Sequence, residues 1–174
     1  LFRAIYFMPV VVSGVVITII WQQLYAYDSG LLNSILVKCG LPPIPWLIHP
    51  KLAMPSISIM ATWKNVGFYI VIFLVGLQNI PAYLYDAAKI DGASAWQTFL
   101  RITIPALHNT MVLVVILSTM AGFSLFIEPY MLTGGGPMGS TMTGMLYIYN
   151  KAFYFGQMGY AAALSSVYAL FILA

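Results

Sequence analysis

Four long apolar stretches, separated by segments rich in glycine, proline and charge, organise this sequence. They lie at residues 4–26, 57–80, 106–127 and 160–174. A helix of about 20 residues crosses the hydrocarbon core of a bilayer, and lipid does not tolerate unpaired backbone, so each stretch predicts a transmembrane α-helix. None shows the strict alternation of a barrel strand. We therefore expect an all-α, polytopic membrane helix bundle whose fourth helix continues past residue 174.

Two connecting segments are dense in helix-breaking residues. Residues 28–55 contain five prolines and two glycines, which predict a loop with one short helix over residues 31–37. Residues 128–159 contain the sequence LTGGGPMGSTMT at 132–143, which predicts irregular structure. Both segments follow spans that run in the same direction, so we expect them on one side of the membrane.

A polar segment with two acids, residues 86–105, lies between the second and third spans. Pro81 suits the start of a helix over residues 82–90, because a backbone N–H in the first turn has no acceptor within the helix and its absence costs little. Gly92 can take the left-handed conformation that ends this helix. Ser94 can cap a second helix that runs through Trp96 and Phe99 towards the membrane. The segment is predicted to be a bent helix–loop–helix at the membrane surface.

Composition agrees with a membrane protein, because 61% of the 174 residues are hydrophobic and 6% are charged, against about 25% charged in soluble domains. The net charge of +3 is dispersed along the chain, which argues against a nucleic-acid surface. Lys and Arg are divided equally between the two sides, so charge does not set the orientation. The lone Cys39 is expected to be a small apolar filler, without a disulfide or metal.

The polar segment resembles the EAA loop of the permease subunits of bacterial ATP-binding-cassette importers. The residues on that pattern are Asp86, Ala87, Ala88, Gly92, Ile102 and Pro105. The resemblance extends over nearly the whole chain through the sequences FRAIYFMPVVVSGVVITIIWQ, GLLN, VGLQNIP and LTGGGP, which look like the carbohydrate-uptake branch. The last of these is similar to the first permease of maltose- and glycerol-phosphate-type systems. The family usually has Glu at the position of Asp86, which keeps the charge on a shorter side chain.

This resemblance implies a single transmembrane permease domain over residues 1–174, in the bacterial inner membrane, from which the opening helices of the full protein are absent. It implies that residues 81–105 form a cytoplasmic coupling loop that docks on a separate ATP-binding subunit, with no cofactor bound by the permease itself. The implied partners are a second permease subunit, the ATP-binding subunits and an extracytoplasmic solute-binding protein. The docking residues would be Tyr85, Asp86, Ala87, Ala88, Asp91 and Gly92.

Polar and aromatic residues inside the spans are candidates for a solute pathway. They are Lys64, Asn65, Phe68, Ser118 and Gly122. Alternatively, Lys64 reaches the outer headgroups, and Ser118 with Gly122 forms a helix contact. Glu128 at a helix end is expected in water, with contact to a binding protein as the alternative. An interfacial aromatic belt is expected from Trp21, Tyr25, Tyr27 and Trp46.

Three functions compete for this sequence. An ATP-driven permease is favoured, and because no GxxxxGK[ST] phosphate loop occurs, ATP hydrolysis is expected in a partner subunit and the chain itself is not expected to be an enzyme. An ion-coupled secondary transporter would need acids within the spans, and none lies centrally in any of them. An intramembrane enzyme would need a catalytic pair, and spacing reveals no partner for Ser13, Ser118 or Ser124.

Overall fold

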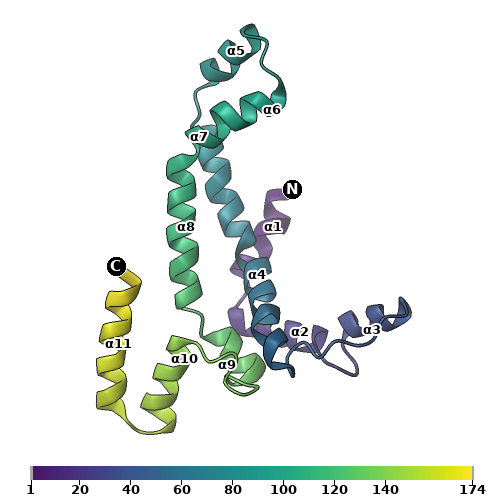
Figure 1. The fold of residues 1–174 in the computed structure, drawn as a ribbon, viewed down its shortest axis with the longest axis vertical. Helices are drawn as coiled ribbons and strands as arrows, with labels where there is room; N and C mark the ends of the chain where they lie inside the picture. Colours follow the sequence, from purple (N-terminus) through teal and green to yellow (C-terminus); the bar gives the residue numbers. More distant parts are fainter. Residues whose placement is uncertain (1, 174) are drawn as a thin grey trace.

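The computed structural model describes residues 2–173, and the side chains of residues 6–173; the described residues form helices joined by loops, without a strand. Figure 1 shows a long molecule in which two extended helices run side by side and shorter helices gather at both ends. The elements are α1 (Phe2–Val11), α2 (Gly14–Leu24), α3 (Leu31–Lys38), α4 (Pro50–Gln78), α5 (Ala82–Ile90), α6 (Ala95–Thr98), the π-helix η1 (Phe99–Thr103), α7 (Ile104–Ala106), α8 (His108–Phe123), α9 (Ile127–Thr133), α10 (Gly144–Tyr149), the π-helix η2 (Asn150–Tyr154) and α11 (Met158–Leu173).

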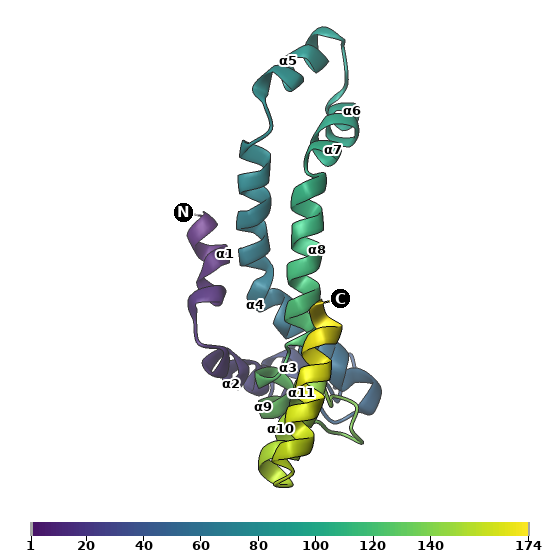
Figure 2. The same ribbon diagram turned by 90° about the vertical axis from the view of Figure 1, so that its left-hand side faces the viewer.

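Helices α4 and α8 form the central antiparallel pair (Figures 1 and 2). Small residues let them approach closely: a Cβ atom added to Gly76 would lie 2.6 Å from the Thr110 hydroxyl oxygen. Close packing through small residues is typical of helix pairs in membranes, where the hydrophobic effect does not drive helices together. By length and hydropathy, α4 and the apolar stretch His108–Thr133 could each cross a membrane.

The prediction of one continuous helix over residues 4–26 is wrong. The chain leaves the helical conformation at Val12 and Ser13, and Ser13 is extended, with φ −51° and ψ 133°. Helix α1 runs along α4, whereas α2 turns to lie across the lower end of the molecule in Figure 2, where it packs on α9. The run of β-branched residues around the break is apolar enough to span a bilayer, so hydropathy alone could not locate the bend.

Close backbone contact holds α1 against α4. A Cβ atom on Gly67 would overlap the carbonyl oxygen of Tyr6, so the absence of a side chain is what allows the crossing. Gly67 is buried. This site is therefore a packing glycine rather than a flexible one.

The loop over residues 28–55 contains the short helix that was predicted, as α3. The prediction is wrong at the end of the loop, because α4 already begins at Pro50 and continues through Pro55. Pro50 stands at the first position of the helix, where its missing N–H costs little, whereas Pro55 lies inside the helix and removes one backbone hydrogen bond. The side chain of His49 caps the start of α4 by accepting from the Lys51 amide at 3.2 Å.

Asn33 organises the loop that joins α3 to α4. Its side chain is buried; the amide nitrogen donates to the carbonyl oxygens of Tyr27 and Ile44, both at 3.0 Å. Its amide oxygen accepts from the Ile44 amide at 3.0 Å and from the Trp46 indole at 2.9 Å. Three of the four hydrogen bonds of this buried amide thus close the loop after α3, and the bond to Tyr27 ties α3 to the segment before it.

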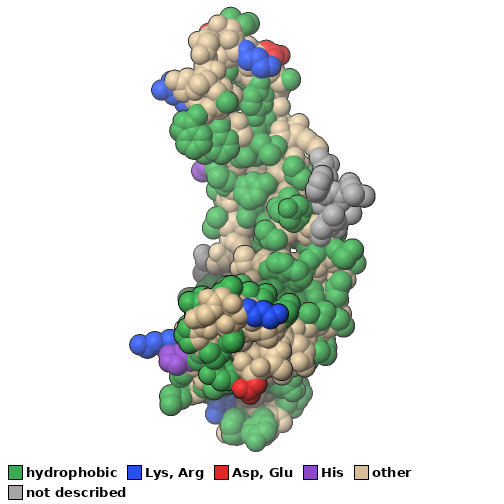
Figure 3. Space-filling model, turned by 90° about the vertical axis from the view of Figure 1, so that its right-hand side faces the viewer, with side chains coloured by type: hydrophobic (Ala, Val, Ile, Leu, Met, Phe, Trp, Pro, Cys, Tyr) green, Lys and Arg blue, Asp and Glu red, His purple; other side chains and the backbone are tan. Residues whose placement is uncertain are grey.

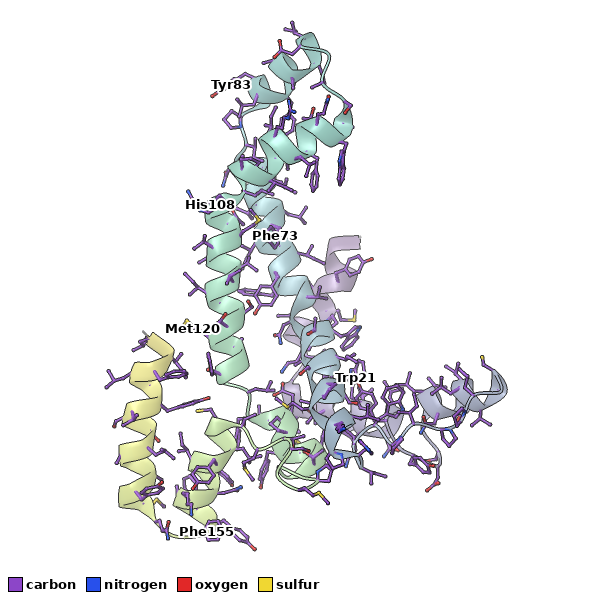
Figure 4. The ribbon with its side chains drawn as sticks, viewed as in Figure 1. Trp21, Phe73, Tyr83, His108, Met120 and Phe155 are labelled. Atoms are coloured by element: carbon purple, nitrogen blue, oxygen red, sulfur yellow. The ribbon has the colours of Figure 1, made fainter. Side chains whose placement is uncertain are left out.

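A hydrophobic core forms where α2, α4 and α9 meet, from Tyr25, Ile57, Met60 and Leu132. Trp21 and Trp46 pack against it, with ring centroids 5.2 and 5.7 Å from that of Tyr25. Figure 4 shows Trp21 directed into this junction. The predicted aromatic belt is therefore wrong for Tyr25, which is buried and donates a 2.8 Å hydrogen bond to the Ser56 carbonyl.

The segment over residues 128–159 is more helical than predicted, since α9, α10 and η2 all lie within it. Irregular structure is limited to residues 134–143 and 155–157. Gly134 ends α9 with φ +60°, a conformation that glycine adopts at little cost. The hydroxyls of Thr133 and Thr141 lie 2.6 Å apart and tie the two ends of the glycine-rich turn together.

Charged side chains lie towards the two ends of the face shown in Figure 3, and hydrophobic side chains cover the middle. Many apolar residues of the single chain are exposed, including Val115 at 62% and Val167 at 65%. A surface of this kind suits lipid or neighbouring helices, because an apolar patch of this extent is rare on soluble monomers.

Candidate functional site

The bent segment between α4 and α8 is the first candidate site. Helix α5 begins after Pro81 and ends at Asp91, in agreement with the prediction. Gly92 has φ +70°, a backbone conformation that glycine adopts at little cost. No atom lies within 4 Å of the point where a Cβ atom would stand, so space is not what requires a glycine here. The sequence thus encodes the bend through one glycine.

The returning arm begins with a complete capping box. The Ser94 hydroxyl accepts from the Gln97 amide at 3.3 Å, and the Gln97 side chain accepts from the Ser94 amide at 2.8 Å. Such reciprocal bonds satisfy two amides that would otherwise lack partners at a helix start. The chain then continues through α6, η1 and α7 into α8 with hardly a break, which connects the bend to the central helix pair.

The two faces of α5 differ in exposure. The outer face presents Tyr83 and Ile90, which are 68% and 87% exposed, together with the exposed Ala87. Figure 4 shows Tyr83 pointing away from the molecule. Tyr83, Ala87 and Ile90 thus form an exposed ridge of small and apolar side chains along one face of α5.

Two of the six predicted docking residues face the other way. Ala88 is 6% exposed, and the Tyr85 hydroxyl lies 3.2 Å from the Thr103 hydroxyl on the returning arm. A helix advances about 100° per residue, so positions 85 and 88 share the inner face, opposite 83 and 87. Asp86, Ala87, Asp91 and Gly92 remain on the exposed surface. We therefore correct the predicted set: Tyr85 and Ala88 support the bend from within.

The charged groups of α5 stand in water. Asp86 and Lys89 form an ion pair at 3.5 Å with side chains 68% and 79% exposed. A pair this exposed contributes little to stability. The acid therefore remains available to a partner at the edge of the outer face.

Figure 1 places α5 and the glycine-rich turn after α9 at opposite ends of the long axis. Helices α4 and α8 separate them. If α4 and α8 cross a bilayer, the two segments face different aqueous compartments.

A pocket of about 430 Å³ between α4 and α8 is the second candidate site. Asn65, Ser118 and Gly122 line it, together with Met54, Ser58, Ala61, Thr62, Val66, Tyr69, Ala121 and Leu125. No atom lies within 4 Å of a Cβ position at Gly122, so within this chain Gly122 borders open space rather than a helix contact. The wall is mostly apolar, with a few convergent hydroxyls and one amide, which is the usual composition of a small-molecule site.

Two predicted pathway residues lie outside the wall of this pocket. Phe68 is 41% exposed and contacts Tyr69 edge-on, with centroids 5.6 Å apart. Lys64 turns away from the pocket and forms an ion pair with Glu128 at 3.0 Å. The expectations that Lys64 reaches the headgroups and that Glu128 sits in water are both wrong, because the two side chains are 18% and 7% exposed. No local signal could have paired residues 64 positions apart.

Together, the long antiparallel helix pair, the exposed bent arm at one end and the glycine-rich turn at the other define an integral membrane component of a transport system. Over its whole length the chain matches the model of the family described as binding-protein-dependent transport system inner membrane component, residues 1–174, and it belongs to that family.

Two relatives in this family are identical to the chain at more than a third of the aligned positions. The lactose transport system permease protein LacF of Rhizobium radiobacter is 40% identical over 177 residues, covering 99% of this chain and 59% of its own length. The probable ABC transporter permease protein YurN of Bacillus subtilis is 37% identical, covering 99% and 60%. The chain thus spans about three-fifths of the length of these curated relatives.

A solved structure has the same fold. In the crystal structure of a bacterial ABC transporter involved in the import of the acidic polysaccharide alginate, one chain superposes with a TM-score of 0.87. The match is 24% identical and covers 99% of this chain and 60% of that one. At this identity the likeness establishes the architecture, which is the type of fold that the sequence predicted.

Proposed function

We propose that the chain is the greater part of a multi-pass permease subunit of an ATP-driven, binding-protein-dependent importer for a sugar or sugar derivative. It would form half of a pathway completed by a second permease, and ATP hydrolysis would belong to separate cytoplasmic subunits. The names of relatives support the solute class, since they include lactose, diacetylchitobiose and trehalose/maltose systems. The orientation follows, with α5 in the cytoplasm and the glycine-rich turn outside.

The observation that carries the proposal is the exposed outer face of α5 at the tip of an arm tied to α8. Tyr83, Ala87 and Ile90 expose apolar surface where no helix of the described chain covers it. An apolar helix face with an acid at its edge suits a groove in a partner. Movement of that partner would reach the solute pocket through α4 and α8, the helices that line it.

Replacing Gly92 tests the docking role in the full importer. Gly92→Leu forces a β-carbon onto a residue with φ +70° and adds bulk at the exposed end of α5, so we expect loss of both the co-purifying ATPase and ATP-driven uptake. Gly40→Leu is a matched control, because Gly40 also has a positive φ, +77°, and open surroundings. It lies in the loop after α3, near the end of the molecule opposite α5. Retained ATP-coupled uptake in Gly92→Leu would contradict the proposal.

The same reconstituted vesicles separate this function from an ion-coupled secondary transporter. An ATP-driven importer accumulates solute only with ATP on the side of α5 and tolerates an ionophore that collapses ion gradients. Uptake that needs no ATP and disappears with the ionophore would favour the secondary transporter. The buried Glu128 does not by itself favour that alternative, since it is already paired with Lys64.

A further inference from the structure

A buried ion pair joins α4 to α9 where the long helix pair meets the short helices. The Lys64 Nζ atom lies 3.0 Å from the Glu128 Oε1 atom, and the carboxylate side chain is 7% exposed. Charges in such surroundings are costly unless they are paired, and removal of one partner leaves the other uncompensated. The other ion pair in the described side chains is the exposed one within α5.

The site around the ammonium group is shaped to hold it. A Cβ atom on Gly14 would lie 2.8 Å from Lys64 Nζ, so the glycine at the start of α2 leaves room for the ammonium group in the position that it takes here. Ile127 lies next to the same position, with its Cδ1 atom 3.7 Å from it. Three helices, α2, α4 and α9, therefore converge on this one charge.

Along the chain, both residues of the pair lie close to residues that line the solute pocket. Asn65, which lines the pocket, is the residue after Lys64 on α4. Leu125, which lines the pocket from the segment between α8 and α9, comes three residues before Glu128. Both charged residues thus sit beside wall residues without lining the pocket themselves.

Leu125 depends on outside contacts for its position, because the helix is interrupted between α8 and α9 at residues 124–126. Its carbonyl accepts a 2.7 Å bond from the Thr143 hydroxyl, and its amide donates a longer 3.3 Å bond to Gly122. An interrupted helix does not transmit direction as a continuous one does. The contact between α9 and α4 therefore adds to these two bonds in setting the position of Leu125 relative to the α4 wall of the pocket.

We propose that Lys64 and Glu128 are positioning residues, which hold the α4 and α8–α9 walls of the pocket in register for the solute. The inference rests on the proposed function, because it assigns the pocket to a solute. An ion pair fixes direction and distance in a way that apolar packing does not, so both charges are needed. Neither residue touches the solute.

A chemical readout of the pocket tests this in the assembled importer without any transport. In a Cys39→Ser background, a Ser118→Cys thiol reports access to the pocket through its rate of reaction with N-ethylmaleimide. Lys64→Met or Glu128→Gln should change this rate by about threefold or more, since thiol reaction follows exposure. The exchange variant Lys64→Glu/Glu128→Lys should restore most of the reaction rate that the Ser118→Cys thiol has with the native pair. A Ser166→Cys thiol on α11, outside this pocket, should react at one rate throughout.

The second readout is uptake of radiolabelled lactose, maltose and trehalose by the same complexes. We expect each single variant to raise KM about tenfold with kcat changed by less than about twofold, as for lost binding interactions. The apolar double variant Lys64→Met/Glu128→Leu restores bulk without direction, and should assemble yet keep the raised KM. This split would not arise from a simple loss of folded protein.

Each outcome has a defined meaning. Unchanged Ser118→Cys rates in both single variants, or wild-type rates and KM in the apolar double variant, would overturn the positioning role. An equal change at Ser166→Cys would also overturn it, because the pair would then act on the whole fold. Altered thiol rates with unaltered sugar uptake would uphold the geometry and instead contradict the assignment of the pocket to the solute.

Discussion

The hydroxyl of Tyr85 lies 3.2 Å from the hydroxyl of Thr103, so a hydrogen bond links the inner face of α5 to the arm that leads into α8. Thr103 is buried, and Ala88, one turn after Tyr85, is covered as well. These contacts close the bend on its inner side while the capping box at Ser94 fixes its return. A force on the exposed face of α5 would thus be transmitted to α8.

Tyr85→Phe should weaken this link without removing the exposed face. Loss of one hydrogen bond costs about 0.5–1.5 kcal/mol, so the amides of α6 and η1 should exchange hydrogen faster. The ATPase should still bind, while the solute transported per ATP hydrolysed should fall. Tyr83→Phe is the control, since Tyr83 is exposed and makes no such bond. Equal exchange rates in the two variants would show that the bond does not stiffen the bend.

Asn33→Ala should open the loop between α3 and α4. It removes four hydrogen bonds from a buried site, and each partner left unsatisfied there costs about 1–3 kcal/mol. We expect proteolysis of residues 28–46 in the folded complex to be faster by about tenfold or more, since about 1.4 kcal/mol is a factor of ten. Ser34→Ala, its exposed neighbour, should leave the rate unchanged. A protease-resistant Asn33→Ala loop would contradict the role of this amide.

Gly67→Val should separate α1 from α4. Its side chain would overlap the Tyr6 carbonyl, and overpacking of this kind costs about 1–3 kcal/mol or more. We expect a lower melting temperature of the purified complex and a lower yield. Gly122→Ala provides the comparison, because the space beside Gly122 is open and the melting temperature should hold. A stable Gly67→Val complex would show that α1 can shift along α4 without cost.

Asn65→Leu and Phe68→Leu should now differ, although the sequence placed both on the solute pathway. Asn65 lines the pocket, and since its side-chain nitrogen already donates to the Ala61 carbonyl at 2.8 Å, its amide oxygen is the group left for a solute. We therefore expect KM for sugar uptake to rise by about tenfold, the scale of one lost polar contact. Phe68 lies outside the wall, and its replacement should leave KM within about twofold. The reverse order of effects would place the solute on the other face of α4.

What could be predicted from the sequence is what local chemistry determines. The bend at Gly92, the cap at Ser94 and the start of α5 after Pro81 each depend on residues within one or two turns, and all were found. The inward direction of Tyr85 and Ala88 was also available from helical periodicity. It was overlooked because the resemblance treated the motif as one block.

The remaining features depend on contacts between distant segments. Tyr25 has the character of an interfacial residue until Ser56 provides a carbonyl in the core, and Lys64 resembles a residue at a helix end until α9 brings Glu128 to it. The break at Ser13 lies in a run of residues with ample hydropathy for one span. Only the packing of α2 on α9 explains why the chain turns there.

The central claim, that the outer face of α5 contacts the ATP-binding subunit, is tested most directly by site-directed cross-linking in the full importer. In a Cys39→Ser background, a bifunctional maleimide should join Ala87→Cys to the ATPase, whereas the buried Ala88→Cys should not react. Met138→Cys, 95% exposed in the glycine-rich turn at the opposite end, should cross-link to the solute-binding protein and never to the ATPase. Cross-linking of Met138→Cys to the ATPase, with none at Ala87→Cys, would contradict the account.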